Sequence, residues 1–349
     1  MSRGCHVSTW QIVFEDLKCM PMGGQYAREK GLRVEEVSPV SGATPVYVTR
    51  VSDTLYIPEL KLQIVDGTLI PDEAIHGPWA LDFERERDFQ NRAAKYRTPF
   101  EVTHSERNVC VLSNFYSENF GHWITEELMR VVVLEHMGYD GDYVVVGLPG
   151  FAMEFMRLLG IDGARLIETV EKPTIFKSAT FVTSVTETEA RKYRELYMLL
   201  RSRILAIADT GQQKLSRRIW MVRGFGVGNG RYEPSNAEEV YRILERNGFE
   251  IVDMASLTLS AQIAAARDAQ ILAGAHGAGL VHTLFMQPGS TVVECFAPFF
   301  INPSVFNICH IMKHRYSMLV HANAYGAYTE PGALMVDPIH LELVLQHCE

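Results

Sequence analysis

The segment ILAGAHGAGLVHTLFMQPGSTVVE, residues 271–294, constrains the fold of this chain more than any other part of it. It opens with the apolar run Ile271–Ala273, which predicts a buried strand. Three glycines then fall within six residues and surround His276. The apolar run Leu280–Met286 predicts a helix, and after a Pro-Gly turn residues 291–295 predict the next strand. This order of strand, glycine-rich turn, helix and strand indicates an α/β fold.

The glycine-rich turn has the character of an anion-binding site. A strand that leads into the start of a helix leaves backbone N–H groups where a phosphate can reach them. Glycine at Gly274, Gly277 and Gly279 permits this approach, because a Cβ would hold the phosphate away from the backbone. His276 adds a side-chain donor, and Glu294 is suited to the hydroxyl pair of a ribose. The alternative is a tight turn in which the glycines serve packing alone.

Strand and helix signals alternate in two parts of the chain, one beginning near residue 109 and one near residue 217. Alternation of this kind predicts parallel sheets with ligands at the carboxyl ends of the strands. The first hundred residues predict only small strands and hairpins. The predicted elements are strands at 109–113, 143–147, 164–167 and 217–224, extended segments near 174–184, helices at 121–137, 151–159, 187–208 and 260–269, and a capped helix followed by a strand within 235–252.

Two blocks, NFGHWITEELMR at 119–130 and HGAGL at 276–280, together resemble glycosyltransferase family 61. Bacterial members of that family act in capsule and surface-polysaccharide assembly, and the resemblance runs from about Asn114 to Pro298. It implies a GT-B-like α/β architecture, with two Rossmann-like domains facing each other across a cleft. It also implies inverting transfer from a nucleotide sugar, with a UDP-sugar favoured and no metal required. His282 stands where the family pattern has asparagine, which leaves the donor sugar open.

Under this resemblance the chain divides into two domains and a closing helix. Residues 1–208 form the acceptor-side domain, 209–216 the linker, and 217–335 the nucleotide-sugar-binding domain. Residues 336–349 begin with an Asp N-cap and a proline at the first helical position, which predicts a last helix. We expect this helix to pack back across the first domain.

Three side chains on the predicted helix 121–137 form one polar stripe. His122, Glu126 and Arg130 lie at positions i, i+4 and i+8, opposite the apolar side. Inverting transfer is a single displacement, so one general base is sufficient. Either His122 is the base while Glu126 holds its other nitrogen, or Glu126 is the base and His122 positions the sugar. Trp123 and Arg130 are assigned to the acceptor side, and an ordinary solvated helix face is the alternative for the whole stripe.

Two arginines are the predicted clamp for the leaving diphosphate. Arg223 ends a predicted strand and Arg231 follows a glycine-rich loop, and guanidinium donors match phosphate oxygens in geometry and charge. A solvated loop charge is the alternative for Arg231. Because a helix N-terminus supplies further N–H groups, no metal ion or other cofactor is expected. The predicted donor-binding residues are Arg223, Arg231, His276, Gly277, Ala278, Gly279, His282 and Glu294.

Several patterns point to other classes of site but fit them poorly. GFGVGNG at 224–230 lacks the third glycine of a dinucleotide fingerprint and leads into no helix, which argues against a nicotinamide enzyme. Asp140 and Asp142 precede an apolar strand, so they predict a turn and not a metal motif. His310 and His314 lack an accompanying HExxH acid, so a solvated or core-edge pair is favoured over a zinc site. The six cysteines are scattered, which predicts reduced buried thiols.

Composition limits the remaining function classes. A length of 349 residues suits two domains, and a net charge of −9 argues against a nucleic-acid binder. No apolar run is long enough to span a membrane and the N-terminus lacks a signal-peptide pattern, so we expect a cytoplasmic protein. Peripheral attachment at the inner membrane, through a saccharide or lipid-linked acceptor, stays open. The rival function is a non-catalytic nucleotide-sugar-binding scaffold of polysaccharide assembly, which would bind the donor without transferring it.

Overall fold

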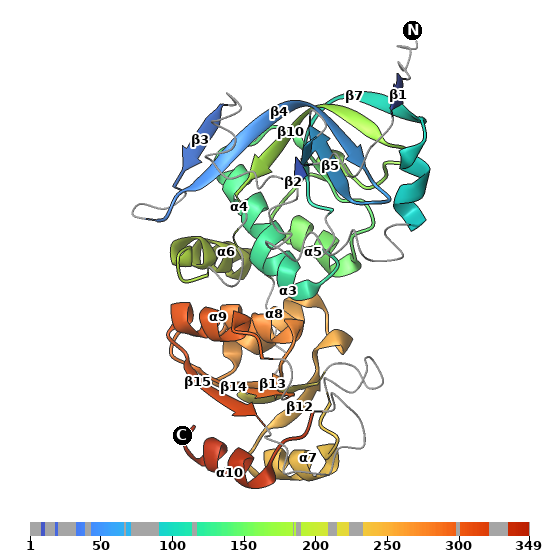
Figure 1. Cartoon of the computed structure of the whole chain (residues 1–349). Coiled ribbons are helices and arrows are strands. Elements are labelled where there is room, and N and C mark those ends of the chain that lie inside the picture. The colour runs from blue at the N-terminus through green and yellow to red at the C-terminus, as the bar shows by residue number, and fades with distance from the viewer. Residues whose placement is uncertain are drawn as a thin grey trace. The chain divides into compact units, whose positions relative to one another are not determined.

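The computed structural model of the chain divides into two compact units, Met1–Thr186 and Glu187–Glu349 (Figure 1). Each unit combines a sheet with helices, which confirms the predicted α/β class. The structure describes residues 8–10, 18–19, 33–38, 43–65, 68–70, 91–113, 117–183, 185, 190–208, 215–222, 233–297, 301–320 and 334–348.

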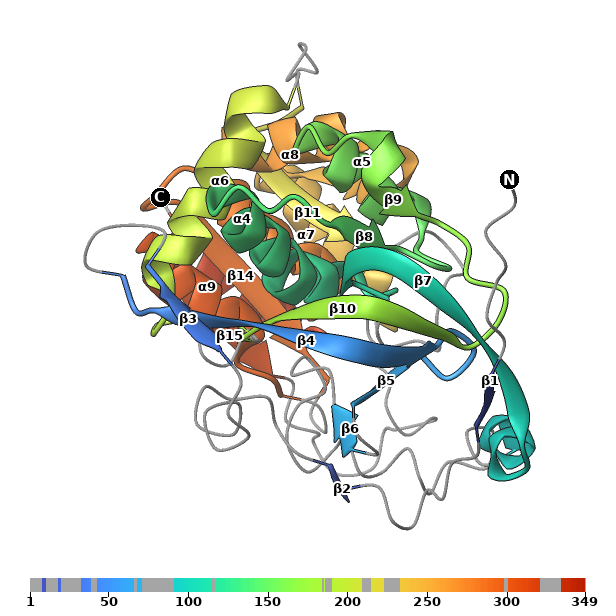
Figure 2. The ribbon, with the colours of Figure 1, turned by 90° about the horizontal axis from the view of Figure 1, so that it is seen from above.

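The described part of the first unit is built on a ten-stranded mixed sheet. Its path runs β2-β6-β5-β4-β10-β7-β8-β9, with β1 paired to β7 and β3 paired to β4. The long strands β4, β10 and β7 lie side by side, with β10 antiparallel to β4 and parallel to β7 (Figure 2). The strands are β1 Ser8–Trp10, β2 Lys18–Cys19, β3 Val34–Val37, β4 Val46–Ile57, β5 Leu62–Val65, β6 Thr68–Ile70, β7 Phe100–Val111, β8 Asp142–Val144, β9 Leu166–Ile167 and β10 Thr174–Val182.

Helices of the first unit connect the parallel strands β7, β8 and β9. Parallel neighbours need a crossover connection, and the predicted helices 121–137 and 151–159 provide it. The first of them is not one regular helix, because a π-helical turn interrupts it. Its parts are α3 Phe120–His122, the π-helical turn η4 Trp123–Glu127 and α4 Leu128–His136, and the second helix is α5 Gly150–Leu158. Short 3₁₀ turns lie at η3 Ala94–Arg97 and η5 Gly163–Arg165.

The second unit contains a five-stranded, all-parallel sheet in the order β12-β11-β13-β14-β15. Numbered within the unit, this is the order 2-1-3-4-5 of a doubly wound fold. Trp220, Ala273 and Val293 point to the face covered by α7 and α10, while Ile219, Leu272 and Val292 point to the opposite face. The elements are α6 Arg194–Ile207, β11 Arg218–Val222, α7 Ala237–Arg246, β12 Glu250–Asp253, η7 Met254–Ser256, α8 Leu259–Asp268, β13 Ile271–Ala275, η8 Ala278–Phe285, β14 Thr291–Phe296, α9 Ser304–Met312, β15 Arg315–Val320 and α10 Pro338–Gln346.

The two compact units meet at residues 186–187, whereas the predicted linker at 209–216 lies mostly outside the described residues and stays a prediction. The helix α6 was expected to end the first domain, but it is grouped with the second unit. Its residue Arg201 donates an Nη2 hydrogen bond to the carbonyl of Met286, 3.0 Å away, at the end of η8. This contact between segments far apart in sequence is one reason why α6 belongs to the second unit.

The last helix begins as the sequence predicts. The Asp337 carboxylate accepts hydrogen bonds from the backbone N–H groups of Ile339 and His340, and Pro338 is the first helical residue. We expected α10 to pack on the first domain. Its apolar residues Leu341 and Leu345 contribute to a core of the second unit that includes residues of α7, because α10 and α7 cover the same sheet face. Packing of α10 on the first domain stays a prediction.

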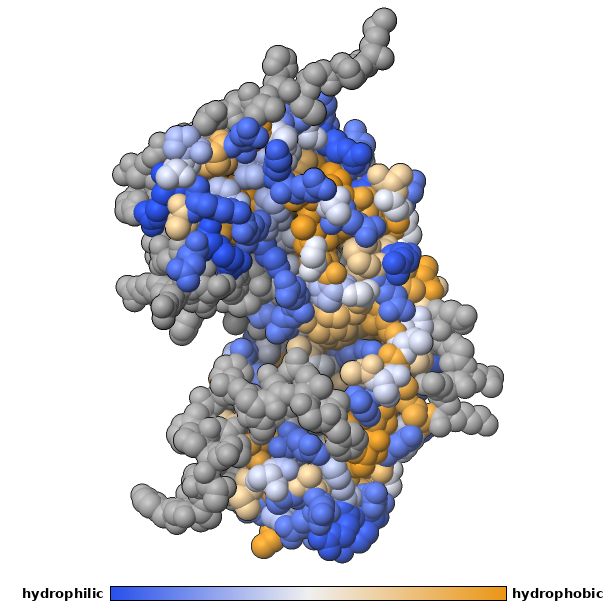
Figure 3. Space-filling view, turned by 90° about the vertical axis from the view of Figure 1, so that its right-hand side faces the viewer, coloured by the Kyte–Doolittle hydropathy of each residue, from blue (hydrophilic) through white to orange (hydrophobic). Residues whose placement is uncertain are grey.

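Among the described residues, no helix is both long enough and apolar enough to cross a membrane. The face of the molecule seen in Figure 3 mixes hydrophilic and hydrophobic side chains, as protein surfaces ordinarily do.

Candidate functional site

In the second unit, the predicted anion-binding turn lies at the carboxyl end of β13, next to β11. Strand β12 flanks β11 and β14 flanks β13, so the strand order reverses between β11 and β13. Ligands of open α/β sheets bind outside the carboxyl ends of the strands at such a switch point. The two strands approach closely, since a Cβ added at Gly274 would lie 3.0 Å from the carbonyl oxygen of Met221. Close packing of β13 against β11 therefore favours glycine at position 274.

His276 follows β13 directly and is held by a network of side chains. Its Nδ1 lies 2.5 Å from Oε1 of Glu294, and the Tyr316 hydroxyl donates to Oε2 of Glu294 at 2.6 Å. The imidazole stacks on the ring of Phe296 with centroids 4.6 Å apart, and the His276 N–H donates to the carbonyl of Cys295. The His276 ring is therefore held at its Nδ1 edge by Glu294 and on its face by Phe296.

Glu294, the residue predicted to contact a ribose, is buried and paired within the protein. Its side chain is 0% exposed, and each carboxylate oxygen already accepts a hydrogen bond from the protein. Burial and the neighbouring Glu294 charge raise the pKa of Tyr316 well above its usual value, so Tyr316 stays a donor. In this geometry Glu294 can orient His276, and its predicted contact with a ribose stays a prediction.

Gly277, Ala278, Gly279 and His282 form the turn that follows. The 3₁₀ helix η8 begins at Ala278, with Gly277 as its N-cap residue. His282 is 2% exposed, and its Nδ1 donates to the carbonyl of Gly279 at 2.7 Å. Burial lowers the pKa of His282 to about 4, so the ring is neutral at pH 7. This hydrogen bond from the buried His282 ring stabilises the turn.

His282 makes the stability of the protein depend on pH. Its folded-state pKa of about 4 lies below the ordinary value of 6.5, so the unfolded chain takes up the proton first on acidification. Stability is therefore complete above about pH 6.5 and falls towards pH 4, by about 3 kcal/mol in total. His282→Asn should remove this part of the pH dependence, measured by chemical denaturation at pH 7 and pH 4.

The matched control is His310→Asn, because His310 is an exposed histidine of the same unit. It should leave the difference between the two pH values unchanged. Burial also lowers the pKa of His314, so His314 likewise lowers the stability of the protein at acidic pH. This contribution is the same in both variants. Equal pH dependence in wild type and His282→Asn would contradict the assignment.

In the first unit, His122 lies where the α3 helix enters the π-helical turn. The Asn119 carboxamide caps the start of this helix, accepting from the N–H groups of Gly121 and His122. His122 Nδ1 lies 2.9 Å from Oε1 of Glu126, one turn later. π-Helical turns inside α-helices occur frequently at functional sites.

Two of the three side chains in the polar stripe, Glu126 and Arg130, are buried, so the stripe is not an ordinary solvated helix face. The side chain of His122 is 22% exposed, whereas that of Glu126 is 0% exposed. Arg130 is also buried, and its Nη1 lies 3.5 Å from Oε2 of Glu127, a buried carboxylate that the sequence analysis did not single out. Trp123 is 0% exposed and lies in the core, and the assignment of Trp123 and Arg130 to the acceptor side stays a prediction.

The other patterns of the sequence have structural explanations. Asp140 lies 3.7 Å from Arg50, and Asp142 lies 3.1 Å from Arg107 at the start of β8, as expected of a turn before a strand. His310 is exposed on α9, whereas His314 follows the helix end and its Nε2 donates to the carbonyl of Thr283. The two histidines share no helix face. Four cysteines are buried, as predicted: Cys110, Cys295, Cys309 and Cys348, of which the last three are free thiols.

Arg223 and Arg231 lie outside the described residues. Strand β11 ends at Val222, the residue before Arg223 in the sequence. The strand order thus places the end of β11 beside His276, which the sequence pattern alone did not show. Binding of the leaving diphosphate by Arg223 and Arg231 stays a prediction.

Residues 120–293 match the family model described as Glycosyltransferase 61. The match supports membership of the glycosyltransferase 61 family. It contains both His122 and His276, and it supports a transferase that acts with a nucleotide sugar and an acceptor. No curated protein matches the chain.

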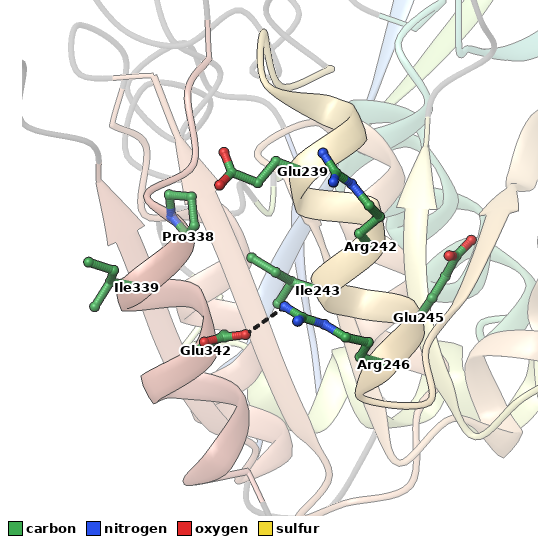
Figure 4. A pocket seen from close by; sticks show the side chains of 8 residues that line it. All are labelled: Glu239, Arg242, Ile243, Glu245, Arg246, Pro338, Ile339 and Glu342. Carbon is green, nitrogen blue, oxygen red and sulfur yellow. Dashed lines mark hydrogen bonds and ion pairs between the residues drawn. The ribbon is translucent and has the colours of Figure 1, made fainter.

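A surface groove between α7 and α10 is separate from these residues (Figure 4). Its volume is about 450 Å³, and a salt bridge of 2.9 Å between Arg246 and Glu342 crosses it. Charges of both signs line it, so it has no preference for an anionic ligand. The lining residues are Glu239, Arg242, Ile243, Glu245, Arg246, Pro338, Ile339 and Glu342.

Proposed function

We propose that this glycosyltransferase 61 protein is an inverting, metal-independent enzyme of GT-B architecture. It moves a sugar from a nucleotide sugar, with a UDP-sugar favoured, to a saccharide or lipid-linked acceptor. The observation that carries the proposal is a pair repeated in both units: a partly exposed histidine held by a fully buried glutamate, His122 with Glu126 and His276 with Glu294. Histidine held in this way can bind or move a proton at one chosen nitrogen.

We assign donor binding to the carboxyl ends of the strands in the five-stranded sheet of the second unit. We assign the Nε2 edge of His276 to the diphosphate of the donor, with Glu294 holding the ring at Nδ1. The turn at Gly277 and the start of η8 supply backbone N–H groups, and Arg223 and Arg231 supply positive charge. These groups neutralise the departing diphosphate, so transfer should persist in EDTA.

The base is assigned to His122. Glu126 is 0% exposed and so is poorly placed to reach an acceptor, whereas His122 is 22% exposed. The acceptor oxygen attacks the anomeric carbon as the bond from that carbon to the diphosphate oxygen breaks. The acceptor proton passes to Nε2 of His122, while Glu126 accepts the hydrogen bond from Nδ1. We place the reaction in surface-polysaccharide assembly in the cytoplasm, at the inner membrane where the acceptor requires it.

His276→Ala should weaken UDP binding by about 1.5–3 kcal/mol, the cost of one hydrogen bond to a charged group. A thermal-shift panel of nucleotides and nucleotide sugars first identifies the ligand, since a ligand of the folded state raises the melting temperature. Calorimetry with UDP then measures the variant.

His310→Ala is the matched control, an exposed histidine on α9 of the same unit, and should bind UDP as the wild type does. Equal UDP affinity in wild type and His276→Ala would remove His276 from the donor site. Donor binding without transfer to any acceptor would favour the non-catalytic scaffold. Loss of transfer in EDTA, restored by manganese, would contradict the metal-independent mechanism.

A further inference from the structure

Glu294 is an unusual residue for its place in the fold. It lies inside β14, whose six residues, Thr291–Phe296, are all buried. A buried carboxylate is costly unless charged or polar partners satisfy it. Its partners are His276 on Oε1 and Tyr316 on Oε2.

Tyr316 reaches Glu294 because of the register between β14 and β15. The parallel pairing sets Val292 beside Tyr316 and Glu294 beside Met318. Residues two apart on a strand face the same side, so the Tyr316 ring lies on the face of the sheet that carries Glu294. Its ring also packs edge-to-face on Phe306 of α9, with centroids 5.3 Å apart. The hydroxyl is thereby held at one oxygen of the carboxylate.

This arrangement decides which oxygen serves His276. A carboxylate held by one donor alone can rotate and offer either oxygen to that donor. With Oε2 occupied by Tyr316, only Oε1 faces Nδ1 of His276, and the imidazole plane is fixed against Phe296. Residues that hydrogen-bond to a functional histidine without contacting the ligand themselves commonly set the tautomer and orientation of that histidine.

We propose that Tyr316 is a positioning residue of the donor site, acting through Glu294 to hold His276 in its ligand-binding orientation, a role that rests on the proposed function. The matched family segment ends at Val293, so neither Glu294 nor Tyr316 lies within it. The assignment comes from the hydrogen bonds and the strand register.

The test uses Tyr316→Phe in the full-length protein, which keeps the ring on Phe306 and removes only the hydroxyl. UDP binding, measured by calorimetry, should weaken about tenfold, as for the loss of one hydrogen bond to a charged group. The ¹⁵N signals of the His276 ring should shift, and they can be assigned by comparison with His276→Ala.

Tyr241→Phe is the matched control. The Tyr241 hydroxyl donates to Glu233 at 3.0 Å in the same unit, so the chemical change is the same at a different place. It should alter neither the UDP affinity nor the His276 signals. In a His276→Ala background, Tyr316→Phe should have no further effect on UDP binding.

Three results would overturn the proposal. They are unchanged His276 signals in Tyr316→Phe, equal UDP affinity in Tyr316→Phe and Tyr241→Phe, and an undiminished effect of Tyr316→Phe in the His276→Ala background. If Tyr316→Phe does not fold, Glu294→Gln should produce the same changes. If the wild type binds no UDP, the donor site itself fails, and the His276 signals still test the positioning role.

Discussion

Replacement of His122 by alanine should lower turnover by about 10²–10⁴-fold with little change in donor affinity, as for removal of a general base. The reason is that His122 is the partly exposed member of the pair, while Glu126 is fully buried behind it. Glu126→Gln should be milder, because glutamine retains an oxygen that accepts from Nδ1 of His122. Steady-state kinetics with the identified donor and acceptor measure both variants.

The control is His136→Ala, an exposed histidine at the end of α4, which should transfer sugar at the wild-type rate. Equal losses in His122→Ala and Glu126→Gln would point to Glu126 as the base. Near-normal turnover in both variants would move the base elsewhere, most simply to an acid in the first hundred residues. Circular dichroism of each variant separates a loss of chemistry from a loss of folding.

The second large effect concerns the buried ion pair one turn further along the helix. Arg130→Met should lower the free energy of unfolding by about 3–5 kcal/mol, because it removes a charged partner of a buried carboxylate. Arg130 and Glu127 are 5% and 1% exposed, and their Nη1 and Oε2 atoms lie 3.5 Å apart. Denaturation in urea, followed by circular dichroism, measures the change.

Two variants complete this experiment. Arg107→Met removes an exposed arginine that lies 3.1 Å from Asp142 in the same unit, and should cost less than about 1 kcal/mol. Glu127→Gln combined with Arg130→Met should recover part of the lost stability, since no uncompensated charge remains at Glu127. A loss below about 1 kcal/mol in Arg130→Met would show that the pair contributes little and that Arg130 is available for an acceptor role.

The sequence by itself determined those features that arise within a few neighbouring residues. The apolar run, glycines and Pro-Gly turn between 271 and 294 specify a strand, a turn, a helical segment and a strand, which the structure contains as β13, η8 and β14. The N-cap at Asp337 is also local, because its carboxylate satisfies N–H groups two and three residues later. The pairing of His122 with Glu126 follows from helical spacing in the same way.

Only the tertiary structure decided which residues surround the two histidines. Strand order brings the end of β11 beside β13, and the register of β14 with β15 brings Tyr316 to Glu294 across 22 positions of the chain. The burial of Glu126 and Glu294 likewise depends on packing by residues that are remote from them in sequence. Sequence patterns report local spacing, whereas desolvation and hydrogen-bond partners depend on how distant segments pack. That is why the pairing of His122 with Glu126 was predictable from the sequence, whereas the contact of Tyr316 with Glu294 was not.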